Sequence, residues 1–538
     1  MKLFENFKER IEEISSKELN QDQKDLAIKI LEKFKDEEKQ LEYVFQFIAQ
    51  RIKTGFRFDA APEANSKTIA ILKKDEELSF VLDENKTKEN TLIIGENYDA
   101  LKNLIIVERE RERAGLSYKY DLIYIDPPYN TEATKNDGNA VSDNNEEIKA
   151  NKFVYRDKYS RNGWLNLMNE RLKLAKELLK DDGVIFVSID DAEQAYLKVL
   201  MDEIFGEENF VNNFMWMHGL GKKDKFSRTL QEYVLCYCRD KSFLKSWRYD
   251  KIIEYDNLSN PDNDSRGEWF SGSISFSEER SNKNHPNYFT IYSPSGISWT
   301  RQWQCNEEEM KELLKNNLIY FGTPPEYNNV PRYKKFNGET VEIILTNFFD
   351  NHGTTKSAKT ELYKIIKKPS DIKKEHTPKP TLLIKDIVKL ISGEKTRILD
   401  FFAGSGTTAH AVLELNREDN GNRTFTLVTN NENNIGIDVN YERLYRINHG
   451  IGTKGETFEW TNKNEPYKAN LNVFKLEYFD VSPNNLDINV KELANKLINV
   501  LKEFGITSID QNNEQEYINL LNDLSSLKPL EKENNESN

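Results

Sequence analysis

The sequence predicts an α/β fold built on a mostly parallel sheet. Short apolar strands alternate with helices on both sides of a middle region that lacks this rhythm, which is the pattern of strand–helix–strand units. Two predicted strands run directly into turns of unusual composition, Asp126-Pro-Pro-Tyr129 and Phe402-Ala-Gly-Ser-Gly406. Because ligands bind at the carboxyl ends of the strands in an open sheet, both turns are candidate sites.

The first α/β segment begins near residue 90. The predicted strands are 91–94, 120–125 and 184–188, and the predicted helices are 97–104, 164–179 and 192–205. The long helix is expected to end at Asp181-Asp-Gly183, because glycine commonly follows the last helical turn. Earlier in the chain, apolar residues at helical spacing between Leu19 and Ile52 predict two N-terminal helices that serve for packing or dimerisation.

The α/β rhythm is lost from about residue 211 to 375, where aromatic and basic residues interleave, and this region is predicted to be an inserted domain. The rhythm resumes with helix 381–390, strand 396–402, helix 407–415, strand 423–429 and helix 440–448. The predicted plan is an N-terminal helical region (1–58), two α/β halves (59–210 and 376–480), the insert (211–375) and a C-terminal helical region (481–538). The extreme end, 530–538, is expected to be disordered.

Composition narrows the class of protein. No apolar run in the sequence is long enough to span a bilayer, and no apolar signal core follows Met1, so we expect a cytoplasmic protein. The net charge of −14 counts against nucleic-acid binding, because phosphate contacts rely on lysine and arginine, but a local basic groove on an acidic protein serves equally well. The three cysteines make no disulfide framework, and Cys236 and Cys238 are expected on one face of a strand rather than as half of a metal site.

Asp126-Pro-Pro-Tyr129 is the candidate catalytic turn. Pro127 and Pro128 make it rigid and remove two backbone donors, so the turn offers acceptors. The amino group on N6 of adenine is a poor nucleophile, because its lone pair is delocalised into the ring. The Asp126 carboxylate and the Pro127 carbonyl are suited to hold its two hydrogens, and Tyr129 offers a ring to a base flipped out of a duplex. The alternative is an ordinary tight turn that contains two prolines.

The second turn joins a strand to a helix and is the candidate cofactor site. Gly404 and Gly406 allow a sharp turn and a close approach of the backbone to a ligand. The pattern is neither a full dinucleotide fingerprint nor a P-loop. A nucleoside cofactor also needs a carboxylate after the next strand, for which Glu432 is preferred over Asp438. The alternative for the turn is an ordinary strand–turn–helix connection. The alternative for Glu432 and Asp438 is a solvated surface charge. The candidate cofactor residues of the turn are Asp400, Phe402, Ala403, Gly404, Ser405, Gly406 and Thr407.

Together these turns resemble the amino-methyltransferases that modify DNA. The first matches the catalytic motif of that family, and the second matches its F-x-G-x-G motif for S-adenosyl-L-methionine (SAM). Their order, with the catalytic motif first and a recognition domain between, is that of the β group, a circularly permuted Rossmann-like sheet. The Asp-Pro-Pro-Tyr form is similar to adenine-N6 enzymes, whereas cytosine-N4 enzymes usually begin this motif with serine.

Residues from about 90 to 480 resemble, more narrowly, the modification (Mod) subunits of type III restriction–modification systems. The segments that carry this likeness are Gly95–Leu101, Tyr155–Tyr159 with Trp164, Thr377–Pro380 before Leu383-Ile384, Phe425–Glu432, Tyr441-Glu-Arg443 and Leu471–Lys475. The resemblance implies that Glu96 and Asn97 lie near the adenine end of SAM. It also implies that the segment containing Lys379 frames the cofactor pocket, and that the enzyme needs no metal.

The resemblance makes the middle domain the target-recognition domain for double-stranded DNA. Its candidate DNA-binding residues are Arg266, Arg301, Arg332, Lys334 and Lys335, together with Lys356 in a loop expected to line the DNA or cofactor cleft. For any one of them the alternative is a solvated basic surface. The implied partners are a second copy of the chain, in a homodimer, and a separate Res subunit with ATPase and nuclease activity.

Three alternatives stay open at this level. The first is a solitary type II-like adenine methyltransferase without a nuclease partner. The second is a protein or RNA substrate, although related enzymes of that kind prefer asparagine in place of Asp126. The third is a non-catalytic nucleic-acid-binding homologue, which the presence of Asp126, Tyr129 and Gly404 disfavours.

Overall fold

The computed structural model describes residues 2–12, 21–36, 40–41, 43–45, 68–129, 161–219, 226–344, 346–366, 377–391, 393, 395–482, 489–507, 509 and 513–528. The family-like segment 155–159 and the expected disordered end 530–538 lie outside these residues.

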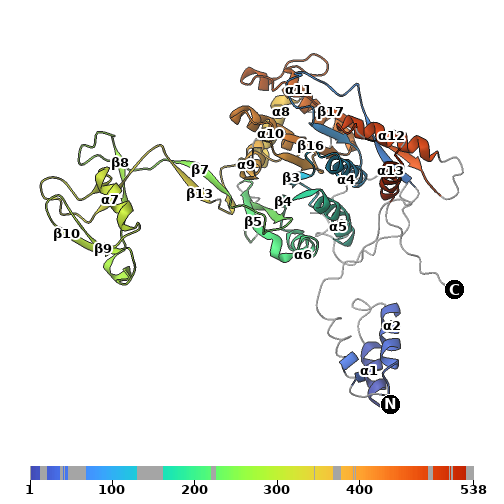
Figure 1. Ribbon diagram of the computed structural model, residues 1–538, viewed down its shortest axis with the longest axis horizontal. Coiled ribbons are helices and arrows are strands. Elements are labelled where there is room, and N and C mark those ends of the chain that lie inside the picture. The colour runs from blue at the N-terminus through green and yellow to red at the C-terminus, as the bar shows by residue number, and fades with distance from the viewer. Residues whose placement is uncertain are drawn as a thin grey trace.

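A ten-stranded sheet forms the centre of the molecule (Figure 1). The strand order is β1-β17-β2-β16-β15-β3-β4-β6-β5-β14. The six strands from β17 to β4 are parallel to one another, and β1 and β6 pair antiparallel with their neighbours. Strand β5 pairs antiparallel with β6 and parallel with β14. The bounds are β1 Thr68–Lys74, β2 Thr91–Ile94, β3 Tyr120–Ile125, β4 Leu179–Ile189, β5 Phe210–Met217, β6 Gln231–Cys238, β14 Phe348–Phe349, β15 Arg397–Asp400, β16 Thr424–Thr429 and β17 Asn472–Asp480. The predicted α/β class is confirmed.

Helices cover both faces of this sheet, because successive strand residues point to opposite sides. In β3, Ile123 and Ile125 enter one core, and Leu122 and Tyr124 enter the other. The first core is closed by α4 Asn97–Arg113, α5 Arg161–Leu178, α6 Gln194–Phe205, α12 Val490–Glu503 and α13 Glu514–Ser526. The second is closed by α8 Thr355–Ile365, α9 Thr381–Ile391, α10 Thr407–Asp419 and α11 Glu442–His449. The parallel strands are therefore buried on both sides, as their apolar sequences require.

The inserted domain is smaller than the sequence predicts. Strands β5 and β6 lie inside the predicted range 211–375, yet they extend the central sheet beside β4, and β14 and α8 also pack against the central domain. Their apolar side chains, such as Phe214 and Val234, are buried there, because β5 and β6 cover the edge that β4 would otherwise expose. The boundaries 211 and 375 are therefore wrong, and the insert runs from about β7 to β13.

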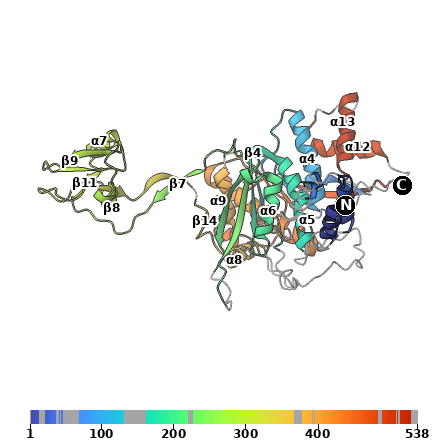
Figure 2. The same ribbon diagram turned by 90° about the horizontal axis from the view of Figure 1, so that it is seen from below.

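This insert projects from the central domain on a two-stranded ribbon of β7 and β13 (Figures 1 and 2). Trp303 and Met310 are buried in its own small core. The bounds are β7 Arg248–Ile253, β8 Trp269–Ser273, β9 Tyr288–Tyr292, β10 Ser298–Gln302, α7 Glu307–Lys315, β11 Ile319–Tyr320, β12 Arg332–Phe336 and β13 Glu339–Ile344. An independent core on a narrow connection is the anatomy of a separate domain.

The end of α5 also differs from the prediction. The helix ends at Leu178, and Leu179 already pairs with Tyr120 of β3. The register then shifts, because the next pairing joins Leu122 to Val184. The predicted terminator, Asp181-Asp-Gly183, is therefore part of a bulge within β4. The strand begins at Leu179, before the glycine, because the leucine side chain is buried in the sheet.

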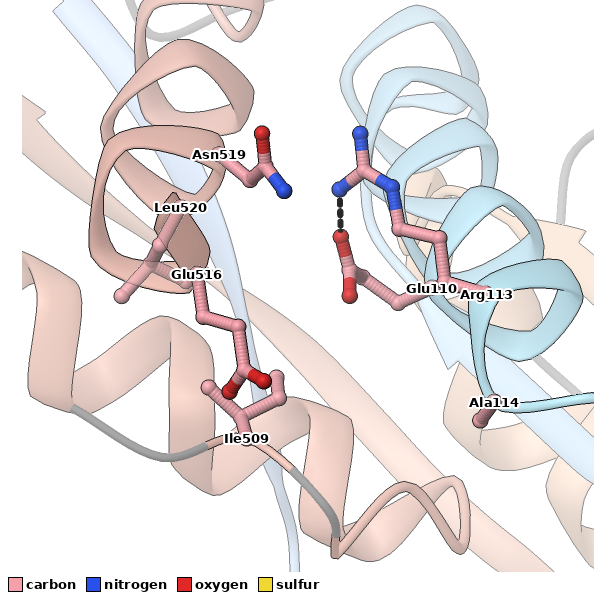
Figure 3. Close-up of a pocket in the computed structure, with 7 residues that line it drawn as sticks. All are labelled: Glu110, Arg113, Ala114, Ile509, Glu516, Asn519 and Leu520. Carbon is pink, nitrogen blue, oxygen red and sulfur yellow. Dashed lines mark hydrogen bonds and ion pairs between the residues drawn. The ribbon is translucent and has the colours of Figure 1, made fainter. Parts of the chain in front are cut away.

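Helices also form both ends of the described chain. Near the N-terminus, α1 Lys2–Glu12 and α2 Gln21–Glu32 pack through a small apolar cluster that includes Phe7 and Leu31. At the other end, α13 docks beside α4, where buried Asp523 accepts a hydrogen bond from Arg109 at 2.6 Å. A small pocket lined by Glu110, Arg113 and residues of α13 lies in this contact (Figure 3).

Both cysteines of β6 are buried in the same core, so they share one face of the strand as predicted. Both are free thiols, and burial raises the pKa of each. They therefore act as small apolar core residues. None of the helices in the described part of the chain combines the length and the hydrophobicity of a membrane span.

Candidate active site

Four parallel strands bring the predicted site residues to one edge of the sheet. Strands β2, β16, β15 and β3 are adjacent and parallel, so their carboxyl ends meet there. Asp126 follows β3 directly, the glycine turn (Phe402–Thr407) follows β15, and Glu96 and Asn97 follow β2. The two motifs, which are far apart in the sequence, thus come from neighbouring strands.

The catalytic turn (Asp126–Tyr129) is part of a lysine cluster, which we define as Asp126, Tyr129, Glu232 and Lys379. The Lys379 ammonium lies 3.0 Å from Asp126 Oδ1 and 3.0 Å from Glu232 Oε2. It also donates to the Tyr129 hydroxyl. That hydroxyl lies 2.9 Å from Asp126 Oδ1 and 3.0 Å from Glu232 Oε2. Trp216 of β5 supports the cluster, since its ring centroid is 5.5 Å from the Lys379 ammonium.

Charge in this cluster is set by burial and by the single lysine. Burial raises the pKa of Asp126, although the charge of Lys379 opposes this effect. Burial alone raises the pKa of Glu232 too, but Lys379 outweighs it, and the pKa of Glu232 is lowered. Burial alone lowers the pKa of Lys379, but the two carboxylates outweigh it, so its pKa is raised. The favoured state has one ammonium between two acidic groups, of which Asp126 is the more readily protonated.

Two acceptors of the catalytic turn stay open. Trp164, which is fully buried, donates from its indole nitrogen to the Pro128 carbonyl at 2.7 Å and fixes the turn. Within the described residues, no donor reaches Asp126 Oδ2 or the Pro127 carbonyl. A ligand amino group with two hydrogens therefore finds two acceptors here, on a backbone that is already fixed.

The glycine turn depends on left-handed backbone at two positions. Gly404 has φ +48° and Gly406 has φ +77°. A side chain at Gly406 would meet Asn440 Oδ1 at 3.0 Å, and the same Asn440 donates to the Gly404 carbonyl at 3.0 Å. Behind the turn, fully buried Arg443 donates to Thr407 Oγ1 at 2.9 Å. The turn is therefore held from the protein side by groups that follow β16.

Asp400 braces the glycine turn from within the fold. Its carboxylate accepts the Phe402 backbone N–H at 3.0 Å and the Thr408 hydroxyl at 2.5 Å, and the side chain is buried. Burial raises the pKa of Asp400 to about 7, because the hydrogen bonds only partly compensate for lost hydration. Of the predicted cofactor residues, Asp400 therefore directs its carboxylate into the turn.

A pH dependence of stability follows from Asp400. In the unfolded chain the pKa of this carboxyl lies near its ordinary value of 3.8, and in the fold it lies near 7, so the folded state binds more protons between these values. We expect the contribution of this group to the free energy of unfolding to fall as pH rises from about 4 to about 7. The variant Asp400→Asn should lose this dependence in denaturant unfolding at a series of pH values.

Asp419→Asn provides the control with the opposite sign. A hydrogen bond from Arg423 lowers the pKa of Asp419, so its contribution is present above the unfolded pKa and is lost as pH falls. If Asp400→Asn showed the same decrease in stability between about pH 4 and about pH 7 as the parent, burial of the charge would not be its cause.

The other predicted cofactor residues lie at the same edge. Asn97 is buried and donates to the Phe401 carbonyl at 2.9 Å, which ties the end of β2 to the glycine turn. Glu96 accepts from Arg171 of α5 at 2.6 Å. Glu432 begins a short turn after β16 and is half-buried, whereas its rival Asp438 is exposed.

Asn430 adds a group that the sequence analysis did not name. Its side-chain nitrogen is buried, and it has no hydrogen-bond partner within the described residues. Its side-chain oxygen accepts the Glu432 backbone N–H at 3.3 Å. Within the part of the chain that the structure describes, a side chain built at Gly404 would meet only the Phe402 carbonyl oxygen, at 3.8 Å, so the backbone is open to these residues there. An unused donor beside a carboxylate and an open glycine turn are features that fit a polar nucleoside ligand.

The predicted DNA-binding residues differ in availability. Lys334 is fully buried and pairs with Asp262 at 2.5 Å and Asp264 at 2.8 Å, so the structure argues against a DNA contact at this residue. Arg266 pairs with Asp264 at 2.7 Å and donates to two backbone carbonyls. Arg332 donates to Ser271. These pairings stabilise the insert itself.

Among the described residues, no carboxylate pairs with the remaining three basic candidates. Arg301 and Lys335 are half-buried and lie near aromatic rings, Arg301 at 5.7 Å from the Trp299 centroid and Lys335 at 5.8 Å from the Tyr333 centroid. Lys356 is exposed in the first turn of α8, on the central domain rather than on the insert. Arg301 and Lys335 therefore lie mainly against aromatic rings, whereas Arg266 is exposed but paired with Asp264.

Sequence reasoning missed Glu232 and Trp216, and it expected Lys379 at the cofactor. The structure brings Lys379 to the catalytic turn instead. No local sequence pattern marks Glu232 as a site residue, because a glutamate at the start of a predicted strand is usually a solvated edge residue. It reaches the cluster because β6 runs antiparallel to β4 and so begins at the edge where β3 ends.

An α/β sheet with a fixed Asp-Pro-Pro-Tyr turn beside a glycine turn defines the class of amino-methyltransferases. Residues 120–449 match the model of a DNA methylase family whose name covers both N6 and N4 methyltransferases, and the chain belongs to this family. Residues 4–114 match a second family, described only as an uncharacterised conserved protein.

Among curated proteins, the chain is 34% identical to the Mod subunit of the type III restriction-modification enzyme StyLTI from Salmonella typhimurium, over 69% of this chain and 56% of that protein. It is 30% identical to the type II methyltransferase M.KpnI from Klebsiella pneumoniae, over 61% of this chain and 79% of that one. The chain thus spans little more than half of the StyLTI subunit.

Solved structures of DNA methyltransferases give a loose match. The complex of M1.HpyAVI with SAM is 13% identical, over 66% of this chain and 98% of that one, at a TM-score of 0.28.

Proposed function

We propose that this chain transfers a methyl group from SAM to N6 of adenine within a short DNA sequence. The observation that carries the proposal is the pair of open acceptors, Asp126 Oδ2 and the Pro127 carbonyl, on a turn fixed by Trp164. They match the two hydrogens of an exocyclic amino group. Membership of the DNA methylase family supports methylation of an exocyclic amino group. The aspartate at the first position of the motif supports adenine as the base.

The residues at the neighbouring strand ends fit SAM as the cofactor. We assign the glycine turn to the methionine side of SAM, and Glu432 with Asn430 to its ribose. Glu96 and Asn97 are assigned to its adenine end. When bound, SAM supplies an electrophilic methyl group. Lys379 acts on methyl transfer by holding the catalytic turn that it contacts. Asp400 acts on cofactor binding by holding the shape of the glycine turn.

The chain's own residues then perform the transfer in one step. Asp126 and the Pro127 carbonyl hold the N6 hydrogens and return the lone pair to nitrogen, and Tyr129 stacks on the flipped base. The methyl group would pass from the SAM sulfonium to this nitrogen, and a neutral thioether would be the leaving group. The N6 proton passes to the Asp126 carboxylate, whose raised pKa favours this transfer. Holding the two reacting atoms in line contributes much of the rate.

We assign target recognition to the insert on its ribbon, with Arg301 and Lys335 facing the DNA and Lys356 lining the cleft. Similarity to the StyLTI Mod subunit supports the assignment as the modification subunit of a type III system. We assign it to act as a homodimer together with a separate Res subunit. The DNA substrate makes the cytoplasm its place of action. The second candidate is a solitary methyltransferase, which the similarity to type II M.KpnI favours.

Long-read sequencing of DNA from cells that express the chain tests the proposal. We expect N6-methyladenine at one short motif, absent from cells with the empty vector. An asymmetric motif methylated on one strand supports the type III assignment, and a palindromic motif methylated on both strands supports the solitary enzyme. N4-methylcytosine in place of methyladenine would refute the base assignment. A chain that bound DNA but no SAM would be a non-catalytic homologue.

A further inference from the structure

Lys379 is surrounded by acceptors that use all of its donors. An ammonium group has three N–H bonds and no acceptor. Here its three partners are Asp126 Oδ1, Glu232 Oε2 and the Tyr129 hydroxyl. Lys379 is only 8% exposed, so water is a poor substitute for a missing partner. The arrangement leaves no lysine donor for the second oxygen of Asp126.

We propose that Glu232 is a positioning residue, which holds Lys379 and Tyr129 on one oxygen of Asp126 and thereby keeps the other oxygen free for the substrate amino group. This inference rests on the proposed function. It assigns a role to a residue outside the motif, on strand β6, which lies beside β4 in the sheet and about a hundred residues later in the chain.

The geometry explains why Glu232 is needed. If its carboxylate were absent, one Lys379 N–H would lose its acceptor. The nearest acceptor within the described lysine cluster is then Asp126 Oδ2, on the carboxylate that Lys379 already contacts at 3.0 Å. A lysine that bridged both oxygens would compete with the substrate amine. Glu232 therefore keeps Lys379 and Tyr129 on Oδ1 of Asp126 and leaves Oδ2 for the substrate amino group.

The charge of Glu232 acts in the same direction. Besides Asp126, Glu232 is a carboxylate whose charge raises the pKa of Lys379 against the effect of burial. Loss of that charge lowers the pKa of Lys379, so the ammonium deprotonates at a lower pH. The alkaline limb of the pH–rate profile then moves to lower pH. A residue with a purely structural role would not move this limb.

Two variants separate the charge of Glu232 from its acceptor. Glu232→Gln keeps an acceptor oxygen and removes the charge, whereas Glu232→Leu removes both. We expect kcat for DNA methylation to fall roughly 10- to 100-fold in Glu232→Leu and less in Glu232→Gln, because misplacement of a reacting group by about 1 Å is this costly. The alkaline limb should shift to lower pH in Glu232→Gln, while SAM affinity stays unchanged.

Glu414→Gln is the matched control. Glu414 pairs with Lys385 at 3.2 Å, and Lys385 keeps a second partner, Glu418 at 2.7 Å, as Lys379 keeps Asp126. This variant removes a comparable ion pair away from the strand edge, and we expect the parental rate and profile. A parental pH profile and kcat in Glu232→Gln would overturn the inference while the proposed function stands.

A crystal structure of Glu232→Gln or Glu232→Leu tests the same point without activity. In the leucine variant, Lys379 should contact both oxygens of Asp126. If Lys379 and Tyr129 stayed on Oδ1 alone, the inference would fail. If the parent chain transferred no methyl group to DNA, the proposed function would fail instead, and the crystal structure would still decide the positioning role.

Discussion

Asp126→Ala is expected to abolish methyl transfer and to leave DNA binding nearly unchanged. The alanine removes one of the two acceptors for the amino group and the base that takes its proton. General-base catalysis alone contributes roughly 10²- to 10⁴-fold. The measurement is transfer of a labelled methyl group from SAM to DNA, with DNA affinity determined by fluorescence anisotropy.

The fold is expected to tolerate this change. Removing one partner of a buried ion pair is destabilising when it leaves a charge unpaired. In Asp126→Ala the Lys379 ammonium keeps Glu232 at 3.0 Å, so its charge stays compensated. Asp126→Asn serves as the second variant, because it keeps the shape and one acceptor but not the basicity. Loss of DNA binding together with transfer in Asp126→Ala would contradict this division of labour.

The pKa of Asp126 also predicts a pH dependence of the rate. Burial raises this pKa, and the reaction needs the carboxylate. The methylation rate should therefore rise with pH through the ionisation of Asp126, at a higher pH than for an exposed aspartate.

Gly406→Ala is expected to weaken SAM binding about tenfold or more. A residue other than glycine costs roughly 1–2 kcal/mol in the left-handed region, and a turn that shifts to relieve this strain must be restored when SAM binds. A loss of about 1.4 kcal/mol in binding corresponds to a tenfold change in affinity. The new methyl group would also meet Asn440 Oδ1 at 3.0 Å and disturb the contact that holds Gly404. Isothermal titration with SAM measures the affinity, and DNA binding without cofactor should be unchanged.

Gly455→Ala is the matched control for this variant. Gly455 has φ +79°, close to the +77° of Gly406, but a side chain there has no described atom within 4 Å. The backbone cost is similar, so both variants should lose comparable stability, and only Gly406→Ala should lose SAM affinity. Equal SAM affinity in the two variants would remove the glycine turn from the cofactor site.

The sequence by itself determined the fold class and the two turns. Strand 120–125 and its Asp-Pro-Pro-Tyr turn are local features, because apolar runs and proline restrict the backbone over a few residues. The same holds for Gly404 and Gly406, whose conformations depend on their own lack of a side chain. The parallel order of the strands then placed both turns at one edge of the sheet.

Only the tertiary structure decided which distant groups meet. Glu232 joins Asp126 because β6 reverses direction beside β4, and strand pairing of this kind leaves no local trace in the sequence. Burial likewise decided that Lys334 pairs with Asp264 and that β5 belongs to the central sheet. The physical reason is that burial and ion pairing depend on contacts between remote segments, whereas turn chemistry depends on neighbours in the chain.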